Sequence, residues 1–525
     1  MKIFSFSPFG YEGSLVAVEV DIRRGIPAID VVGLADGAVK ESRERMKSAI
    51  RNSGFEFPLE RVLISLSPAD LKKEGAGFDL AIALAVLDAQ QQDESDEAVL
   101  VMGELELSGQ LRPVRGVHAA VSTAMAAGIT KCIVSSANAE EAREVESMKV
   151  FAAENLTEAF GAIYDSKLFV SGADLQKNGL SGAGRGIPEG SVKIGEVYFG
   201  PVDSEHEFAE ILGQKRLIRA LQIAAAGCHN LIAFGPPGCG KTLSIQKFTA
   251  LQPLLTVEEA QSVTRIHSLA GLLQPSSPII RMGAFRMPHQ TASIEGMCGG
   301  GVNCRPGEIS LAHNGVLFLD EAAEFKTSVL QMLRVPLESG SITLSRAGRT
   351  SIYPARFQLL MATNPCPCGN FGVPGKLCLC SARAVEMYWK KFSGPLLDRI
   401  DLRVSVEGKS TADRTDGTIG DNPSTAQLRQ EIARAVEIQR KRGVKNGYLK
   451  PQEILQYCSL DKESKEYLEK QIELCDFSQR SVSGCLRLAR TIADMKGEEN
   501  IKLEHLQEAV SFRKNDGPLS CMEEN

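Results

Sequence analysis

Several features that define other classes of protein are missing from this sequence. No apolar run approaches the about 20 residues that a membrane-spanning helix needs. The opening residues, MKIFSFSPFGYEG, contain neither a long apolar segment nor a small-residue cleavage site, so we expect no signal peptide. The net charge of −6 argues against a cationic coat for nucleic acid, although it permits a local basic channel. We therefore expect a cytoplasmic protein without a membrane partner.

Cysteine is scarce in the first half of the chain. Of 13 cysteines, three precede residue 290: Cys132, Cys228 and Cys239. Four others crowd into the segment CPCGNFGVPGKLCLC in a C-x-C-x9-C-x-C pattern: Cys366, Cys368, Cys378 and Cys380. Because cytosolic thiols stay reduced, such a cluster indicates a metal before a disulfide, and four thiolates suit a closed, structural Zn²⁺ site. Free buried cysteines and a redox-sensitive pair are the alternatives.

Length and composition indicate several globular domains. The chain is 43% hydrophobic and 24% charged, and 525 residues exceed what one hydrophobic core serves. Residues 1–165 alternate β-rich runs such as RVLISLSPAD with helical patterns such as FDLAIALAVLDA, which predicts an α/β domain. Residues 166–202 are glycine-rich, so we expect a linker, or else an ordered connection lying on a neighbour. Residues 203–405 alternate strands and helices, and residues 406–525 are strongly helical.

A glycine-rich loop follows a predicted apolar strand. In NLIAFGPPGCGKTLSIQKF, the strand LIAF precedes the pattern G-x-x-x-x-G-K-T and a helix follows, which is the context in which this motif binds phosphate. The loop comprises Gly235, Pro236, Pro237, Gly238, Cys239, Gly240, Lys241 and Thr242. Its glycines allow successive backbone N–H groups to face phosphate oxygens, and the helix adds its positive end. The sequence thus predicts bound ATP, with Lys241 on the β and γ phosphates and Thr242 on Mg²⁺.

Two further strand ends are expected to complete this site. The run from Val316 to Leu319 predicts a buried strand ending at Asp320 and Glu321, and we expect that end to lie beside the loop of the first strand. Asp320 would hold Mg²⁺ through water, and Glu321 would orient or deprotonate the attacking water. RFQLLMATNPC predicts another strand ending at Asn364, which could position the same water or only form a turn before a proline.

Several long segments identify a family. Over nearly its full length the chain resembles the ComM/YifB family of magnesium chelatase-like AAA+ ATPases, in VVGLADGAVKESRERMKSAI, PADLKKEGAGFDL, PGEISLAHNGVLFLDEAAEF, YPARFQLLMATNPCPCG, SGPLLDRIDL and LARTIADM. The resemblance implies an α/β P-loop NTPase (AAA+) core, a C-terminal helical lid, and a hexameric ring with ATP between subunits. It implies that Arg399 is an arginine finger acting on the neighbour's γ phosphate. It also implies that Arg480 is the second sensor arginine, with Arg487 as its rival; each arginine could instead be a salt-bridge partner.

Two insertions also match the family. RMGAFRMPHQTASIEGMCGGGVNCRPGEIS falls where related motors carry an insertion in their second helix. ESGSITLSRAGRTSIYPARF looks like the hairpin before the first sensor, with Arg346 and Arg349 at or near its tip. In related helicases such hairpins line the central pore, and a cationic tip suits contact with DNA phosphates. A solvated surface hairpin is the alternative.

The first domain resembles the proteolytic domain of Lon. That fold uses a serine nucleophile in a glycine-rich loop and a lysine base about 40 residues later, whereas here Gly77 and His118 occupy the corresponding positions. Without a hydroxyl or thiol at the loop no acyl-enzyme can form, so we expect a catalytically degenerate, Lon-protease-like scaffold. A basic helical segment in this domain could guide DNA or be a solvated face: Lys40, Arg43, Arg45, Lys47 and Arg51.

The resemblance favours a motor that acts on nucleic acid. ComM-like proteins are associated with branch migration of DNA during natural transformation, so a DNA helicase is the leading expectation. Residues 427–450 hold seven Lys or Arg against two Glu, which could face nucleic acid or solvent. Metal insertion into a porphyrin and ATP-dependent remodelling of a protein partner remain the other hypotheses.

Overall fold

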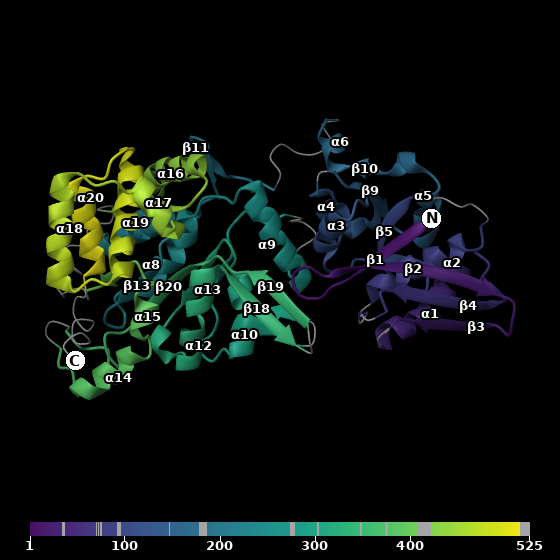
Figure 1. The fold of residues 1–525 in the computed structure, drawn as a ribbon, viewed down its shortest axis with the longest axis horizontal. Coiled ribbons are helices and arrows are strands. Elements are labelled where there is room, and N and C mark those ends of the chain that lie inside the picture. Colours follow the sequence, from purple (N-terminus) through teal and green to yellow (C-terminus); the bar gives the residue numbers. More distant parts are fainter. Residues whose placement is uncertain are drawn as a thin grey trace.

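A computed structural model describes residues 1–33, 37–69, 71, 73, 76–91, 96–145, 147–177, 186–273, 279–301, 304–346, 349–372, 376–407 and 422–514. The molecule is elongated, with an N-terminal α/β domain at one end, a set of C-terminal helices at the other and a central domain between them (Figure 1). Within the described part of the chain, no helix has the length and apolar character needed to cross a bilayer.

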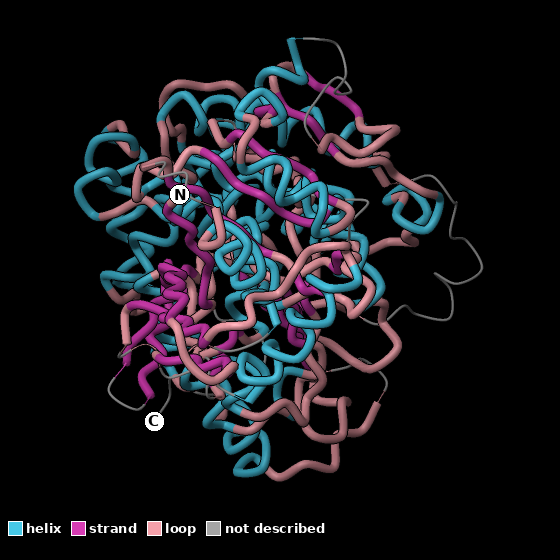
Figure 2. Tube along the Cα trace, turned by 90° about the vertical axis from the view of Figure 1, so that its right-hand side faces the viewer, coloured by secondary structure: helices cyan, strands magenta, loops and turns pink. Residues whose placement is uncertain are grey.

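The N-terminal domain is built on one mixed sheet with helices on both faces (Figure 2). Its eight strands lie in the order β10 (Val170–Ser171), β9 (Lys149–Ala153), β8 (Lys131–Ser135), β5 (Ala98–Met102), β1 (Lys2–Ser7), β2 (Ser14–Arg23), β4 (Arg61–Ser67) and β3 (Ala28–Val32). The helices are α1 (Gly37–Asn52), α2 (Asp79–Asp88), α3 (Val117–Ala126), α4 (Ala139–Arg143), α5 (Leu156–Ile163) and α6 (Gly172–Lys177).

Alternation along the strands divides this domain into two hydrophobic cores. Val99 and Val101 of β5 face the core that contains α1, α2 and α5, while Leu100 and Met102 face the core that contains α3 and α4. Successive strand residues point to opposite faces of a sheet, so a continuous apolar strand can serve both cores. The helix α1 ends at Asn52, two residues before Gly54, which has a φ of +85°.

The region expected to be a linker is narrower than 166–202. Residues 170–177 form β10 and α6, which extend the N-terminal domain, and β10 pairs with β9. Residues 192–199 form a hairpin of β11 (Val192–Ile194) and β12 (Val197–Phe199). Val197 and Phe199 are fully buried in the core of the central domain, and their burial explains why this segment is ordered.

The central domain is a five-stranded parallel sheet. Its order is β14 (Phe285–Arg286), β17 (Val316–Leu319), β20 (Gln358–Thr363), β13 (Leu231–Phe234) and β21 (Leu402–Ser405). Its longer elements on the two faces and beside the sheet are α7 (Lys215–Gly227), α8 (Lys241–Gln246), α9 (Val257–Ala270), α12 (Thr327–Met332), α13 (Arg334–Ser339), α14 (Ala382–Lys390) and α15 (Gly394–Leu397). All four residues of β13 and of β17 are buried, as the apolar runs predicted.

Both predicted insertions form hairpins. The first holds α10 (Ile294–Cys298), the strands β15 (Gly299–Gly300) and β16 (Arg305–Pro306), and α11 (Glu308–Leu311). A hairpin between two short helices is the arrangement expected of an insertion within a helix. The second is β18 (Ser341–Arg346) paired antiparallel with β19 (Arg349–Pro354), as predicted.

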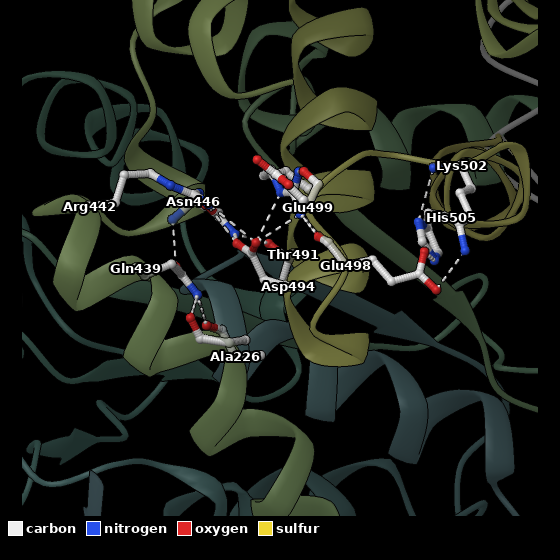
Figure 3. Close-up of polar contacts among 12 residues, drawn as sticks. Ala226, Gln439, Arg442, Asn446, Thr491, Asp494, Glu498, Glu499, Lys502 and His505 are labelled. Carbon is white, nitrogen blue, oxygen red and sulfur yellow. Dashed lines mark hydrogen bonds and ion pairs between the residues drawn. The ribbon is translucent and has the colours of Figure 1, made fainter. Parts of the chain in front are cut away.

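The C-terminal helices share a hydrophobic core with one face of the central sheet and with α7. They are α16 (Thr425–Arg442), α17 (Pro451–Tyr457), α18 (Lys462–Cys475), α19 (Gln479–Lys496) and α20 (Leu503–Arg513). A polar network reinforces the attachment: Gln439 donates to the carbonyl oxygen of Ala226 in α7 at 2.7 Å, and Asp494 accepts from Asn446 at 2.8 Å and from Arg442 at 3.2 Å (Figure 3). These helices and the central domain therefore pack as one body.

Candidate nucleotide-binding site

The glycine-rich loop lies between β13 and α8, at the carboxyl end of the sheet. A Cβ at Gly235 would lie 2.1 Å from the carbonyl oxygen of Val406, so only glycine fits there. Gly238 and Gly240 have φ values of +77° and +90°, which side chains rarely adopt. The loop can therefore turn tightly around a small anion before α8 begins at Lys241.

The side chain of Lys241 is buried within this loop and is 7% exposed. Its Nζ donates to the carbonyl oxygens of Gly235 at 2.7 Å and of Pro236 at 2.9 Å. Among the described residues, no carboxylate lies within ion-pair distance of this ammonium group. Burying a charge without a counter-charge is costly, so the loop is suited to receive an anion such as a phosphate.

A second strand end brings acids to the loop. The hydroxyl of Thr242 donates to Oδ1 of Asp320 at 3.1 Å, and the same oxygen accepts from the backbone N–H of Glu321 at 3.0 Å. Hydroxyl and carboxylate oxygens are the ligands that Mg²⁺ takes in proteins, so this pair fits a magnesium ion. The two residues lie 78 positions apart in sequence and meet at the same edge of the sheet.

The strand order adds one residue to this site. The strand β20 lies between β13 and β17, although Asp320 at the end of β17 still contacts the glycine-rich loop through Thr242. The interposed strand ends at Thr363, which places Asn364 between the glycine-rich loop and the two acids. In an open parallel sheet, ligands bind beyond the carboxyl ends of adjacent strands, and three such ends meet here.

The backbone of Glu321 is held in an unusual conformation. Its φ of +47° lies in the left-handed region, which costs energy for a residue other than glycine. The residue is exposed, and its N–H is tied to Asp320. Strain of this kind is often stored at functional sites, and here it falls on the residue that the sequence singled out for catalysis.

The four cysteines converge beside this site. The Sγ of Cys366 lies 3.3 Å from that of Cys368 and 3.7 Å from that of Cys378, and Cys368 lies 3.6 Å from Cys378. With Cys380, all four sulfurs lie within 4.8 Å of one another. Four thiolates at the usual Zn–S distance would be about 3.8 Å apart in a tetrahedron, so the donor set fits zinc.

The cysteine turn also contacts the glycine-rich loop directly. A Cβ at Gly369 would lie 2.7 Å from Cδ of Pro237, so the two loops are in close contact. The indole N–H of Trp389 donates to the carbonyl oxygen of Pro365 at 2.9 Å, which fixes the start of the turn. The backbone N–H of Asn370 and the thiol of Cys366 lower the pKa of Cys368 to about 6.

The two arginines expected to act on nucleotide lie on a different surface. Arg399 and Arg480 both bind Glu338, the second at 3.2 Å, and the hydrogen bond and charge of Arg399 lower the pKa of that carboxyl. All three residues line a cavity of about 670 Å³, and none of residues 235–242, all of which the structure describes, lines it. The rival Arg487 instead donates to the carbonyl oxygen of Gly447 at 2.9 Å. Within one chain, the glycine-rich loop therefore lies at a different site from Arg399 and Arg480.

The expected DNA contacts are only partly described. The strands of the hairpin place Arg346 opposite Arg349 at its tip, but the side chains of both arginines lie outside the described residues. The side chain of Lys40 in α1 also lies outside them. Arg45, on the same helix, forms an ion pair with Asp79 at 2.9 Å, so it is not a free cation.

The basic run at residues 427–450 is divided between the interior and the surface of the protein. Five of its seven cations bind other groups of the protein: Arg429, Arg434, Arg440, Arg442 and Lys445. Four of the seven are exposed to solvent: Arg434, Arg440, Lys441 and Lys450. Arg429, for example, is 3% exposed, donates to the carbonyl oxygens of Ala250 and Gly200, and stacks on the ring of Phe199. Arg429 and Arg440 therefore connect this run to the central domain, whereas Lys441 and Lys450 remain exposed.

The N-terminal domain shows no catalytic constellation at the positions compared with Lon. Gly77 lies in the turn Ala76–Phe78 before α2, and Val114 is the nearest neighbour that a Cβ there would meet, at 3.9 Å. His118 is 3% exposed, and neither ring nitrogen has a partner among the described residues. Burial lowers the pKa of His118 to about 4, so this imidazole is neutral near pH 7.

Comparison with known proteins covers each part of the chain. The family model for subunit ChlI of Mg-chelatase matches residues 18–138, the model for magnesium chelatase subunit ChlI matches 207–414, and the ChlI C-terminal model matches 422–513. The competence protein ComM of Haemophilus influenzae is 37% identical over 522 residues, which covers 97% of each chain. The uncharacterized protein YifB of Escherichia coli is 39% identical over 511 residues, 97% of this chain and 96% of its own. The magnesium-chelatase 38 kDa subunit of Cereibacter sphaeroides is 23% identical over 174 residues, 30% of this chain and 52% of its own.

Proposed function

The chain belongs to the ComM/YifB family of magnesium chelatase-like AAA+ ATPases, and from this membership we propose that it is an ATP-driven DNA motor. In this proposal the protein is a hexameric helicase that promotes branch migration in recombination or natural transformation. The Haemophilus influenzae relative is named a competence protein, which supports a role in natural transformation. The family itself implies ATP hydrolysis.

One observation carries the proposal for ATP hydrolysis: the contact of Thr242 with Asp320 beside the buried Lys241. We assign Lys241 to the β and γ phosphates, and Thr242 and Asp320 to Mg²⁺, which when bound would neutralise phosphate charge. Glu321 orients or deprotonates the attacking water, and Asn364 helps to hold that water. Gly238, Cys239 and Gly240 supply backbone N–H groups to the phosphates, since Pro236 and Pro237 have none.

The arginines support a site shared between subunits. Because Arg399 and Arg480 lie together in a cavity apart from the loop, a single chain cannot apply them to its own nucleotide. In a ring, each subunit would present this pair to the nucleotide of its neighbour, where a guanidinium stabilises charge in phosphoryl transfer. Glu338 then holds both side chains until phosphate replaces it.

The hairpin supports DNA as the substrate. Its sequence places two arginines at the tip, and phosphate contacts supply most of the sequence-independent affinity for nucleic acid. We propose that the six tips line the pore and contact the DNA backbone. An ATPase that inserts metal into porphyrin or remodels proteins would not need this cationic tip.

The test is ATPase and strand displacement over three-strand and four-way DNA junctions. Glu321→Gln should retain ATP binding but lose about 10³-fold in turnover, since the group that handles the water is gone. Glu324→Gln, a nearby exposed glutamate in the same segment, is the matched control and should behave as wild type. Equal ATPase rates with and without branched DNA would contradict the motor proposal and favour a chelatase or protein-remodelling role.

We also propose that Cys366, Cys368, Cys378 and Cys380 hold a structural Zn²⁺. The sulfur separations and the contact of Gly369 with Pro237 support this assignment, since a metal here would stiffen the turn beside the loop. Elemental analysis of the purified protein should find one zinc per chain, released when the thiols are modified. Zinc-free protein with four reactive thiols would contradict it.

A further inference from the structure

The loop between β1 and β2 of the N-terminal domain contacts the hairpin of the central domain. The backbone N–H of Tyr11 donates to Oγ of Ser351 in β19 at 3.0 Å, and the ring of Tyr11 packs edge-on against that of Tyr353, with centroids 5.9 Å apart. Gly10 approaches so closely that a Cβ there would lie 1.8 Å from Oγ of Ser351. Two successive inward-facing residues of β19 are therefore held by another domain.

The helix α9 fixes the same loop from the other side. Arg265 donates from Nε to the carbonyl oxygen of Tyr11 at 3.1 Å, and its guanidinium lies 4.6 Å from the centroid of the Tyr11 ring. Its Nη2 also pairs with Glu12 at 3.2 Å, and Oγ of Ser262 lies 3.3 Å from the Tyr11 hydroxyl. Every polar group of Tyr11 thus has a partner in the central domain.

The Tyr11 ring also completes a small hydrophobic cluster under the hairpin. Tyr353 is buried with Ile266 of α9 and Leu311 of α11, and Tyr11 and Leu344 of β18 pack on this group. An aromatic pair contributes beyond its buried area, and the cation beside the ring adds to it. The inner face of the hairpin is therefore formed jointly by the two domains.

We propose that Tyr11 is a positioning residue through which the N-terminal domain sets the orientation of the hairpin β18/β19. When the domain is docked, the loop restrains β19 at Ser351 and Tyr353, and the tip is held in one direction. When the loop withdraws, the hairpin loses a hydrogen bond and a packed ring and can swing. The N-terminal domain thereby acts on the hairpin without any catalytic group. Only the consequence for DNA rests on the proposed function.

Hydrogen exchange of the full-length protein tests the contact itself. Tyr11→Ala should speed exchange of the amides of residues 341–354 about tenfold, because local opening becomes easier there. Tyr11→Phe keeps the ring and should stay near wild type. Tyr164→Ala is the control, since Tyr164 contacts Asp88 and Phe160 within the N-terminal domain. Gly10→Ala should reproduce the Tyr11→Ala result, because its Cβ displaces the loop from Ser351.

DNA-stimulated ATPase provides the second measurement. In Tyr11→Ala, the ratio of stimulated to basal rate should fall at least severalfold while the basal rate stays within twofold of wild type. Unchanged hairpin exchange in Tyr11→Ala would overturn the inference. If the variant misfolds, Ser351→Ala decides, because it removes the same hydrogen bond from the hairpin side and must also speed exchange. If DNA does not stimulate the ATPase of the wild-type protein, the proposed function is contradicted. Hydrogen exchange of the hairpin amides would still test the role of Tyr11.

Discussion

The glycine-rich loop and the arginine pair are held in opposite ways. Asp320 follows the buried strand β17, and Lys241 begins α8 after the loop that leaves the buried strand β13, so the positions of both follow from the packing of the central sheet. Arg480 is 52% exposed and Arg399 is 12% exposed, and both bind Glu338, whose side chain is 60% exposed. In the proposed ring, groups that bind nucleotide in their own chain would be fixed in advance, whereas the arginines offered to a neighbour would be held by an exposed carboxylate that a phosphate could replace.

The largest effects are expected when the glycine-rich loop and the arginine pair are mutated separately. Lys241→Ala and Arg399→Ala should each lower ATP turnover on the order of 10³-fold, since one removes the phosphate cation and the other the trans guanidinium. If the sites are shared, a mixture of the two variants should recover measurable ATPase, because some interfaces then contain an intact loop and an intact arginine. Steady-state rates of the variants and of their mixture check this.

The mixture has a clear contrary outcome. If it is as inactive as either variant alone, the loop and the arginine act within one chain, and the comparison fails. Arg112→Ala changes an exposed arginine of the N-terminal domain and should leave all rates unchanged.

Removal of Arg480 should have a smaller effect than removal of Arg399. Arg480→Ala is expected to lower kcat about tenfold, because Arg399 remains to stabilise the transition state. Arg480→Lys should recover part of the lost kcat. A purely structural salt bridge to Glu338 would allow the same recovery. KM for ATP must therefore be measured separately from kcat. A loss in Arg480→Ala as large as that in Arg399→Ala would show that the two arginines act as a single unit.

Disruption of the cysteine cluster should affect nucleotide binding at the glycine-rich loop and leave the function of the arginine pair unchanged. Cys378→Ser is expected to weaken binding of a fluorescent ATP analogue about tenfold, since supporting groups of this kind typically cost such factors. A mixture of Cys378→Ser with Lys241→Ala should then recover less ATPase activity than the mixture of Arg399→Ala with Lys241→Ala. Cys475→Ser, in α18 and outside the cluster, is the control. Unchanged nucleotide affinity in a zinc-free Cys378→Ser protein would separate the metal from the loop.

The smallest effect is expected at Glu338. Glu338→Gln frees both arginines from their shared carboxylate, so KM for ATP should fall about twofold to fivefold, in keeping with the modest strength of surface ion pairs. ATPase assays over a range of ATP concentration measure this change. A fall in kcat comparable to that in Arg399→Ala would instead mean that Glu338 positions the arginines for catalysis.

Local sequence patterns predicted the parts of the site that depend on one segment. The loop, the buried strand before Asp320 and the hairpin all appear where residue type and spacing placed them. The convergence of four cysteines was also foreseen, because all of them lie within 15 residues. In each case the physical cause, an apolar period or a turn residue, is contained in a short stretch of chain.

Features that depend on several segments could not be predicted. The placement of β20 between β13 and β17 is set by sheet topology, which the strand sequences do not encode individually. The charge of residues 427–450 suggested a surface, but carbonyl oxygens from distant segments accept from Arg429 and Arg440. Nothing near Tyr11 in the sequence signals that it would meet Ser351, which lies 340 residues away.

The helix α9 has a mechanical consequence. Near its first turn, Glu259 pairs with Lys445 just beyond α16 at 2.7 Å, and near its last turn Ser268 donates to Glu141 of the N-terminal domain. Its 14 residues form a rod about 21 Å long that connects the two outer parts of the molecule. A tilt of about 5° at one end would displace the other by about 2 Å, comparable to the helix shifts that accompany switching in other proteins. The helix α9 can therefore act as a lever, so that a force applied at the C-terminal helices displaces the opposite end of the molecule.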